Sequence, residues 1–273
     1  MKRIDLHTHT TKSDGTDSPW ALVEKAGAAG LCAIGVTDHD TVAGVSEARA
    51  AGACFGVEVI SGVELCAGWE GREIHLLGYF LDPESPALSE ALDWVIKDRR
   101  DRNEKMAALM AADGLPVSAG ELYGKYPQST VGRPHFGEKL IELGLVSSVR
   151  EAFVKYLDPG CKYYVRRNFL PLKKAAEVIL AAGGRPVLAH PLQYKFTEDK
   201  LRELAALSRD WGVWGMECIY TGYSPQAQAG LFSLAESLGM GITGGSDYHG
   251  GHKPHIRLGE LPVPESLLFK LRP

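Results

Sequence analysis

Three short stretches of this chain combine histidines with carboxylates. They are Asp5-Leu6-His7-Thr8-His9, Thr37-Asp38-His39-Asp40 and Ser246-Asp247-Tyr248-His249. Imidazole and carboxylate groups are the usual ligands of divalent zinc, iron, manganese and magnesium ions. Alternate residues of a strand point to the same face about 6–7 Å apart, so His7 and His9 can share one ion. The stretches therefore predict a metal site that is assembled from distant parts of the chain.

Short apolar runs precede most of these residues, and we expect each run to be a strand. The predicted strands alternate with helices, which favours a largely parallel sheet. About seven strand–helix units, interrupted once, correspond to an α/β barrel, and 273 residues is a normal length for such a fold. The strands are expected at 3–6, 33–37, 57–66, 74–80, 185–189, 215–220 and 241–245, and the helices between them at 19–28, 42–52, 172–182, 198–211 and 224–238.

Candidate metal ligands stand at the end of nearly every predicted strand, where parallel barrels form their active sites. A single histidine is more often structural, and Asp14 lies in a Ser-Asp-Gly sequence that is typical of a turn. Packing does not explain why so many ligand-type residues occupy equivalent positions, and Glu217 joins them without an assigned role. The predicted multinuclear site contains His7, His9, Asp14, His39, Glu64, His75, His190, Asp247 and His249.

The segment 85–171 has a different pattern, with helices expected at 87–112, 134–143 and 147–157 and no convincing strand. We interpret it as a helical insertion, or cap domain, within a discontinuous barrel domain of residues 1–84 and 172–273. The charged run Lys97-Asp98-Arg99-Arg100-Asp101-Arg102 is interpreted as a solvated helix face rather than a binding patch.

The composition restricts the partners. A net charge of −4 gives no reason to expect long duplex nucleic acid or an anionic membrane, although a local basic pocket remains open. Five scattered cysteines without a Cys-x-x-Cys pair argue against disulfides and a thiolate zinc site. We find neither a secretory signal nor a run of about 20 apolar residues, so we expect a cytoplasmic protein with no membrane partner. The oligomeric state stays open.

The motifs resemble those of the PHP (polymerase and histidinol phosphatase) superfamily over nearly the whole chain. The matching motifs are Asp5-x-His7-x-His9, Thr37-Asp38-His39, Gly62-Val63-Glu64, His75, Ala189-His190-Pro191 and Ser246-Asp247-x-His249. The resemblance implies an α/β fold, a distorted (β/α)7 barrel of PHP type, with three divalent ions per chain. It implies one ion held by His7, His9, Glu64 and Asp247, a second by Glu64, His75 and His190, and a third by Asp14, His39 and His249.

The resemblance also implies the chemistry. A hydroxide activated by the ions is the expected nucleophile, with His190 and Asp247 as the catalytic residues. We find no Gly-x-Ser-x-Gly elbow or Walker loop. Asp14 stands where some relatives have histidine, which favours Mn²⁺ or Mg²⁺ over Zn²⁺. Mn²⁺ is the expected ion, with Fe²⁺, Mg²⁺ and Zn²⁺ as alternatives. Asp5, Asp38 and Asp40 are expected to orient ligand imidazoles, although Asp40 suits the start of a helix equally well.

Cationic residues near a Gly-Arg-Pro-His sequence are candidates for binding phosphate. Arg133 precedes a proline that suits the first turn of a helix, and its guanidinium can grip phosphate with two hydrogen bonds. A structural salt bridge is the rival interpretation of Arg133. The predicted phosphate-binding residues are Arg133, His135, Lys139 and Arg166, while the role of Arg167 stays open.

Thr37 to Thr41, Gly62 to Glu64, His75 to Tyr79 and Gly132 to His135 resemble one branch of the family. That branch contains 3′,5′-nucleoside bisphosphate phosphatases and a 5′→3′ exoribonuclease that acts on short RNA. The resemblance implies removal of the 3′-phosphate from pAp-like nucleotides, with short 5′-phosphorylated RNA as a further substrate. A histidinol-phosphate phosphatase is the alternative, and a non-catalytic PHP module that serves a polymerase and a metal-dependent C–N hydrolase are less favoured.

Overall fold

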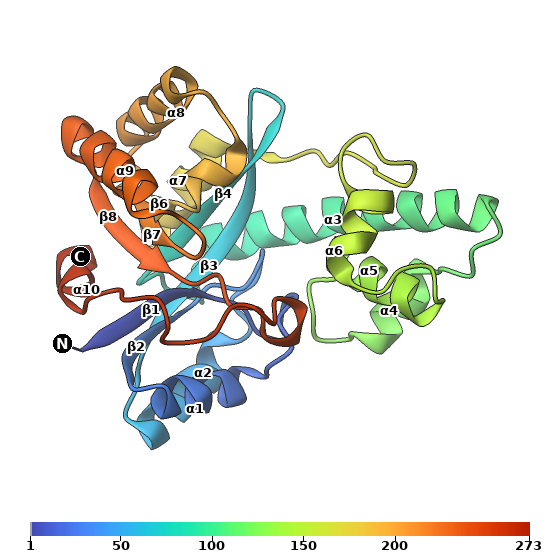
Figure 1. The fold of residues 1–273 in the computed structure, drawn as a ribbon, viewed down its shortest axis with the longest axis horizontal. Helices are drawn as coiled ribbons and strands as arrows, with labels where there is room; N and C mark the ends of the chain where they lie inside the picture. Colours follow the sequence, from blue (N-terminus) through green and yellow to red (C-terminus); the bar gives the residue numbers. More distant parts are fainter. Residues whose placement is uncertain (1) are drawn as a thin grey trace.

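A barrel-shaped sheet of mixed direction forms the centre of the protein, which a computed structural model describes for residues 2–273 (Figure 1). The strands are β1 (Arg3–Thr8), β2 (Leu31–Val36), β3 (Glu58–Trp69), β4 (Arg72–Tyr79), β6 (Arg185–Leu188), β7 (Gly215–Tyr220) and β8 (Gly241–Gly245), paired in this order. A short strand, β5 (Leu170–Pro171), pairs with β3 off this path. The amide of Asp247 donates to the carbonyl of His7 at 2.9 Å, so the chain beyond β8 returns to β1. The predicted barrel class is confirmed.

The sheet is largely parallel, as predicted, and β4 is the exception on the main path. This strand runs antiparallel to both β3 and β6. A two-residue turn joins β3 to β4, and both Glu70 and Gly71 have positive φ angles of 45° and 77°, as tight hairpins require. Because β4 runs in reverse, its first half lies at the rim where the parallel strands end. His75 therefore reaches the same rim from the beginning of a strand.

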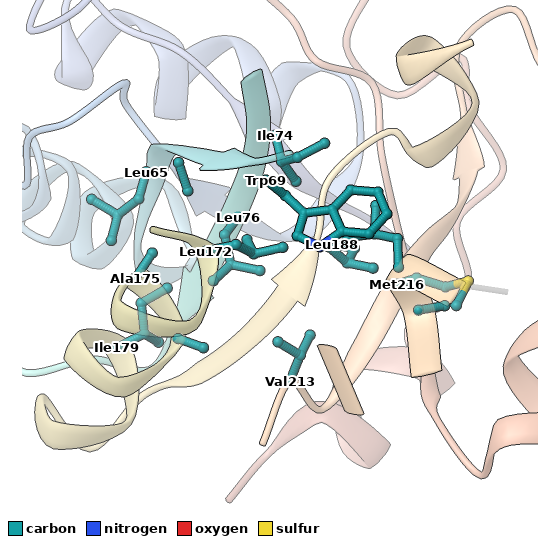
Figure 2. Packing of buried hydrophobic residues seen from close by; sticks show 14 of the residues in the cluster. Leu65, Trp69, Ile74, Leu76, Leu172, Ala175, Ile179, Leu188, Val213 and Met216 are labelled. Atoms are coloured by element: carbon teal, nitrogen blue, oxygen red, sulfur yellow. The ribbon is translucent and has the colours of Figure 1, made fainter. Parts of the chain in front are cut away.

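Helices cover the outside of the barrel. They are α1 (Pro19–Ala28), α2 (Val45–Phe55), α7 (Leu172–Ala181), α8 (Glu198–Asp210), α9 (Pro225–Leu238) and the unpredicted α10 (Ser266–Leu271). Ser18, Thr197 and Ser224 cap three of them by accepting hydrogen bonds from first-turn amides, which fixes where those helices begin. Figure 2 shows Leu65, Leu76 and Leu188 of the sheet packed with Leu172 and Ile179 of α7. No helix within residues 2–273 is long and apolar enough to cross a membrane.

A group of helices extends from one side of the barrel (Figure 1). It contains α3 (Pro86–Ala112), α4 (Ala119–Lys125), α5 (Arg133–Glu142), α6 (Val149–Ala152) and a π-helical turn at Phe153–Leu157. The sequence did not predict α4. Met106, Leu122, Phe136 and Leu140 belong to a separate hydrophobic cluster within this group. That cluster supports the predicted cap, whose boundaries at residues 84 and 171 stay a prediction.

The helix α3 contributes to both the barrel and the cap. Its 27 residues correspond to about 40 Å at 1.5 Å per residue. Leu88 and Leu92 near its start pack in the barrel cluster, whereas Met106 and Met110 near its end pack in the cap cluster. The middle of α3 therefore lies where the cap meets the barrel.

Candidate metal centre

The structure gathers the nine predicted ligands at one rim of the barrel, around the buried side chain of Glu64. In the first predicted group, Glu64 Oε2 lies 3.2 Å from the Nε2 atoms of both His7 and His9. Asp247 Oδ1 lies 3.5 Å and 3.2 Å from the same two nitrogens. Ligand atoms that share one ion at bond lengths of about 2.1 Å lie about 3.0–3.4 Å apart. The four atoms thus have the spacing of ligands around a single ion.

Several of these atoms lack a hydrogen-bond partner although they are buried. His7 Nε2, His9 Nε2, Glu64 Oε2 and Asp14 Oδ1 make no hydrogen bond within residues 2–273. Burying a polar atom without a partner costs free energy that a native fold rarely tolerates. A divalent cation would satisfy these lone pairs together, and so the side chains fit a metal.

The other two predicted groups extend on either side of Glu64. Its second oxygen, Oε1, lies 2.9 Å from His75 Nδ1 and 3.0 Å from His190 Nε2. Asp14 Oδ1 lies 3.3 Å from His249 Nε2, and Asp14 Oδ2 lies 3.9 Å from His39 Nε2. Glu64 therefore turns one oxygen toward the first group and the other toward the second, as the predicted bridging role requires.

Burial and mutual charge set the ionisation of this cluster. Burial alone would raise the pKa of the Glu64 carboxyl, but surrounding imidazoles, His39 foremost, hold it well below its usual range. The same opposition between burial and neighbouring positive groups leaves the pKa values of Asp14 and Asp247 well below normal. Burial lowers the pKa of His39 to about 3 and also lowers that of His249. For His7, His9 and His75, contacts with neighbouring acidic groups outweigh burial and raise the pKa, to about 9 for His9. Because metal ions bind ionised carboxylates and neutral imidazoles, a bound ion would replace protons on these three rings.

The carboxylates predicted to orient imidazoles contact other groups instead. Asp5 accepts hydrogen bonds from the backbone amides of His7 and Ser246, at 3.3 and 2.9 Å. Asp38 accepts from the backbone amide of Thr10 at 2.7 Å. These contacts fix the backbone that carries the first ligands. Neither carboxylate contacts an imidazole directly, but Asp38 accepts from Ser13 Oγ at 2.6 Å, and Ser13 Oγ lies 3.5 Å from His9 Nδ1.

Two other glutamates approach the ligand rings. Glu217 Oε1 lies 3.1 Å from His7 Nδ1, and Glu73 Oε1 lies 3.5 Å from His75 Nε2. Sequence reasoning left Glu217 unassigned and missed Glu73. A glutamate inside the otherwise apolar Met216-Glu217-Cys218 strand was a signal that a polar group lies within the barrel.

Backbone strain marks three positions at this rim. Asp40, His190 and Asp247 have φ angles of 54°, 29° and 59°, in the left-handed region that side chains with a Cβ atom rarely adopt. Such conformations each cost about 1–3 kcal/mol and persist where surrounding contacts enforce them. Their position at strand ends turns the side chains of His190 and Asp247 toward the ligand cluster.

A cavity of about 680 Å³ opens beside the ligands, between the rim and the cap. Asp14, His39, His75 and His249 line one side of it. Besides Glu73 and neutral residues, the lining contains the basic residues Arg99, Arg102, Arg133, Arg150, Arg167, His252 and Lys253. The cavity thus joins the metal ligands to a basic surface, on which an anionic substrate can lie.

Two arginines of this surface come from the run that was expected to face solvent. Arg99 and Arg102 are only 8% and 4% exposed, so the prediction is wrong for both. Residues three apart on a helix share one face. That face of α3 is turned into the cavity, whereas Lys97 and Arg100 are exposed.

Asp40 anchors part of the basic surface. Its buried carboxylate pairs with Arg99 and, at 3.5 Å, with Arg167, and it accepts the Cys66 amide at 2.9 Å. Burial alone would raise the pKa of Asp40, but the two guanidinium groups lower it. Both predicted roles of Asp40 are wrong, since it contacts arginines and α2 begins later, at Val45.

Arg102 differs from its neighbours because it has no acidic partner. Its Nε donates to Asn103 Oδ1 at 2.9 Å, and it forms no ion pair within residues 2–273. Burial, and after it the charges of Arg99 and Arg133, push the pKa of Arg102 well below its usual value. A buried guanidinium without a carboxylate is costly unless an anion from outside pairs with it.

Among the four predicted phosphate-binding residues, only Arg133 lines the cavity. It also forms the rival salt bridge, with Glu73 at 3.2 Å. His135 is 2% exposed, and its Nδ1 accepts the amide of Gly132 at the start of α5. Lys139 pairs with Glu121 in the cap, and Arg166 donates to the carbonyl of Gly71 at 3.0 Å outside the cavity. The phosphate contacts predicted for His135, Lys139 and Arg166 are therefore not supported, because other groups hold these side chains away from the cavity.

The carboxylate oxygen of Asp247 that points away from the ligand cluster, Oδ2, also has partners. Tyr220 donates to Asp247 Oδ2 at 2.7 Å, and Lys253 Nζ lies 2.6 Å from the same oxygen. Nearby, His252 donates to the carbonyl of Asp14 at 2.6 Å and pairs with Glu138 of α5. The segment after β8 therefore supports a ligand and joins the rim to the cap.

Comparison with solved structures gives the class. A protein of Bifidobacterium adolescentis described as a metal-dependent phosphoesterase superposes with a TM-score of 0.90 at 28% identity, covering 99% of this chain and 95% of that one. A Chromobacterium violaceum structure described as an amidohydrolase with bound sulfate gives a TM-score of 0.87 at 30% identity, covering 94% and 90%. With its ligand cluster and basic cavity, this protein is a metal-dependent phosphoesterase.

Sequence relatives define the family. The PHP domain model matches residues 5–127. A 5′-3′ exoribonuclease of Haemophilus influenzae is 35% identical over 255 residues, covering 91% of this chain and 90% of that protein. A 3′,5′-nucleoside bisphosphate phosphatase of Chromobacterium violaceum is 32% identical over 250 residues, covering 91% and 88%. The chain belongs to the PHP domain family, as its motifs predicted.

Proposed function

We propose that this enzyme removes the 3′-phosphate from nucleoside 3′,5′-bisphosphates such as pAp. Release of 5′-mononucleotides from short 5′-phosphorylated RNA is a second candidate, favoured by the 35% identity to a protein named 5′-3′ exoribonuclease. The relative named 3′,5′-nucleoside bisphosphate phosphatase covers a similar share of the chain and supports removal of the 3′-phosphate.

The observation that carries the proposal is the shared cavity of the ligand cluster and Arg102. The ligand cluster accounts for one phosphate, the one that reacts. The buried guanidinium of Arg102, with Arg99 and Arg133 beside it, calls for a second anion. A nucleoside bisphosphate carries two phosphates on one small molecule, and the cavity of about 680 Å³ is of the size that proteins use for such ligands.

The proposed ion sites are the three groups around Glu64. When bound, divalent ions supply an ionised water near neutral pH and neutralise phosphoryl oxygens. The chain's own part is to place the substrate. Arg102 and Arg133 fix the second phosphate by charge-assisted hydrogen bonds. Lys253 and Tyr220 hold Oδ2 of Asp247, so that Oδ1 faces the ligand cluster.

A phosphate-release screen in the presence of Mn²⁺ tests the proposal. The substrates are pAp, 3′-AMP, 5′-AMP and histidinol phosphate, and release of mononucleotides from a short 5′-phosphorylated RNA is followed separately. We expect kcat/KM for pAp to exceed that for 3′-AMP by about tenfold or more, because only pAp adds the second phosphate and one charge-assisted contact contributes at least about 1.4 kcal/mol.

Two outcomes would overturn the assignment. Equal turnover of pAp and 3′-AMP would show that the basic surface does not bind the second phosphate. Faster turnover of histidinol phosphate than of pAp would favour the alternative enzyme. Arg102→Met should abolish the preference for pAp, whereas Arg100→Met, on the exposed face of the same helix, should keep it.

A further inference from the structure

Glu217 lies deep inside the barrel, on β7, with none of its surface exposed. Both of its carboxylate oxygens are used. Oε1 and Oε2 lie 3.1 and 3.3 Å from Nδ1 of His7, and Oε2 accepts the backbone amide of His190 at 2.8 Å. Within residues 2–273, no lysine or arginine forms an ion pair with it. A buried carboxylate without a cationic side chain is costly, so its contacts with His7 and His190 must compensate for its burial.

The contact with His7 selects one form of the imidazole ring. A carboxylate accepts a proton, so Nδ1 of His7 is the nitrogen that carries hydrogen. In the neutral ring, which is the form that binds a metal ion, the opposite nitrogen, Nε2, then keeps its lone pair. Nε2 lies 3.2 Å from Glu64 Oε2 in the first ligand group. Asp5 contacts the backbone amide of His7 and not its ring. Glu217 is therefore the carboxylate that orients the ring through Nδ1.

The contact with His190 acts on the backbone. His190 has a φ angle of 29° and ψ of 57°, a strained conformation just after β6. Its amide donates to Glu217, and this bond helps to hold the strained turn. In that turn, His190 Nε2 lies 3.0 Å from Glu64 Oε1, in the second ligand group.

We propose that Glu217 is a positioning residue that links the first two metal positions, because one carboxylate fixes a ligand of each. It sets the ring of His7 for the first position and the backbone of His190 for the second. The inference rests on the proposed function only for the ligand roles of His7 and His190. Loss of Glu217 therefore weakens metal binding at both positions together, whereas loss of a single ligand acts first on its own position.

The test compares Glu217→Gln, Glu217→Asp and the surface control Glu236→Gln. A glutamine has one acceptor oxygen instead of two and no charge, so it should hold the His7 ring and the His190 amide more weakly than the carboxylate does. Binding of Mn²⁺ alone is measured by calorimetry and by metal content after dialysis. We expect Glu217→Gln to bind Mn²⁺ about 10–100-fold more weakly, with fewer ions retained at two positions, and Glu236→Gln to match the unaltered protein.

Imidazole proton resonances of the Zn²⁺-loaded protein separate positioning from a merely structural role. The proton on His7 Nδ1 should be visible in the unaltered protein and lost in Glu217→Gln, while circular dichroism in EDTA shows an unchanged fold. If Glu217→Gln does not fold, Glu217→Asp serves instead, because it keeps the charge but is one methylene shorter; folded protein with weaker Mn²⁺ binding supports the proposal.

Normal affinity and ion content in a folded Glu217→Gln variant would overturn the inference. So would weaker binding with the His7 Nδ1 proton unchanged, because the ring would then not depend on Glu217. These measurements contain no substrate. A failure of the proposed substrate assignment would appear only in the phosphate-release screen, so the two failures are distinguishable.

Discussion

Arg102→Met should affect stability and function in opposite directions. Arg102 is 4% exposed, has no acidic partner within residues 2–273 and lies among the charges of Arg99, Arg133 and Arg167. Methionine keeps the length and much of the apolar volume of the side chain but removes the charge. We therefore expect a more stable protein that binds its substrate poorly.

The magnitude follows from two opposing contributions. Removing a buried, uncompensated charge should stabilise the fold by about 2–3 kcal/mol. Losing the hydrogen bond from Arg102 to Asn103 should cost about 1 kcal/mol. The net gain of about 1–2 kcal/mol corresponds to a Tm increase of roughly 2–8 °C for a chain of this size. Removing a charged partner of a buried phosphate should cost about 2–4 kcal/mol of binding, or roughly a 30- to 900-fold increase in KM for pAp.

Two assays check these values. Thermal unfolding of the substrate-free protein gives Tm with and without inorganic phosphate, and steady-state phosphate release gives KM. Phosphate should raise the Tm of the unaltered protein more than that of Arg102→Met, because a bound anion stabilises only the state that binds it. Arg100→Met controls for the loss of an arginine from α3. A lower Tm for Arg102→Met together with an unchanged KM would refute the reasoning.

Three further predictions concern the rim. His9→Ala should abolish activity and lower bound metal, measured by elemental analysis, because His9 belongs to the first ligand group and lies 3.9 Å from Asp14 of the third. His252→Gln should lower Tm at pH 6 but not at pH 9, because pairing with Glu138 outweighs burial and raises the pKa of His252, so its stabilisation is present below the unfolded pKa and lost as pH rises through the folded one. Gly245→Ala should destabilise the protein by about 1–3 kcal/mol in denaturant titrations, since the added Cβ would meet the His7 amide nitrogen at 2.5 Å.

Each of these predictions has a control variant or a result that would contradict it. His255→Ala, at an exposed histidine, should leave the metal content unchanged. A constant Tm difference from pH 6 to pH 9 would contradict the role given to His252. Gly230→Ala adds its methyl group in open space on α9 and should be neutral or stabilising. Normal metal content in His9→Ala would refute the ligand assignment.

The clustering of the candidate metal ligands could be predicted from the sequence because strand ends and ligand chemistry both leave local signals. His7 and His9 follow an apolar run at strand spacing, and Asp247 and His249 repeat the pattern. The rim position of these residues then follows from parallel topology. The same logic placed His75 correctly but for the wrong reason, since β4 reaches the rim by reversing direction after the Glu70-Gly71 turn.

The basic surface could not be predicted because it depends on contacts between distant segments. Arg99 and Arg102 look like residues of a solvated helix until the rim and the cap cover that face of α3. Lys139 and Arg166 were candidates for phosphate binding because they are cationic, and only the fold shows that they contact Glu121 and the Gly71 carbonyl instead. Charge in a sequence identifies ionisable groups, but it does not determine which side of a helix a later segment will bury.

The antiparallel direction of β4 has a mechanical consequence for the cap. The chain leaves β4 at the end of the barrel opposite the ligand rim, so α3 has to carry it back along the barrel. As one continuous helix, α3 holds Leu88 in the barrel, Arg102 in the cavity and Met110 in the cap. The cap therefore cannot move relative to the barrel on this side without bending α3 near Arg102, where we propose that the second phosphate binds. We therefore expect α3 to keep the cavity lining at a constant distance from the ligand cluster, which would limit the length of substrate that fits.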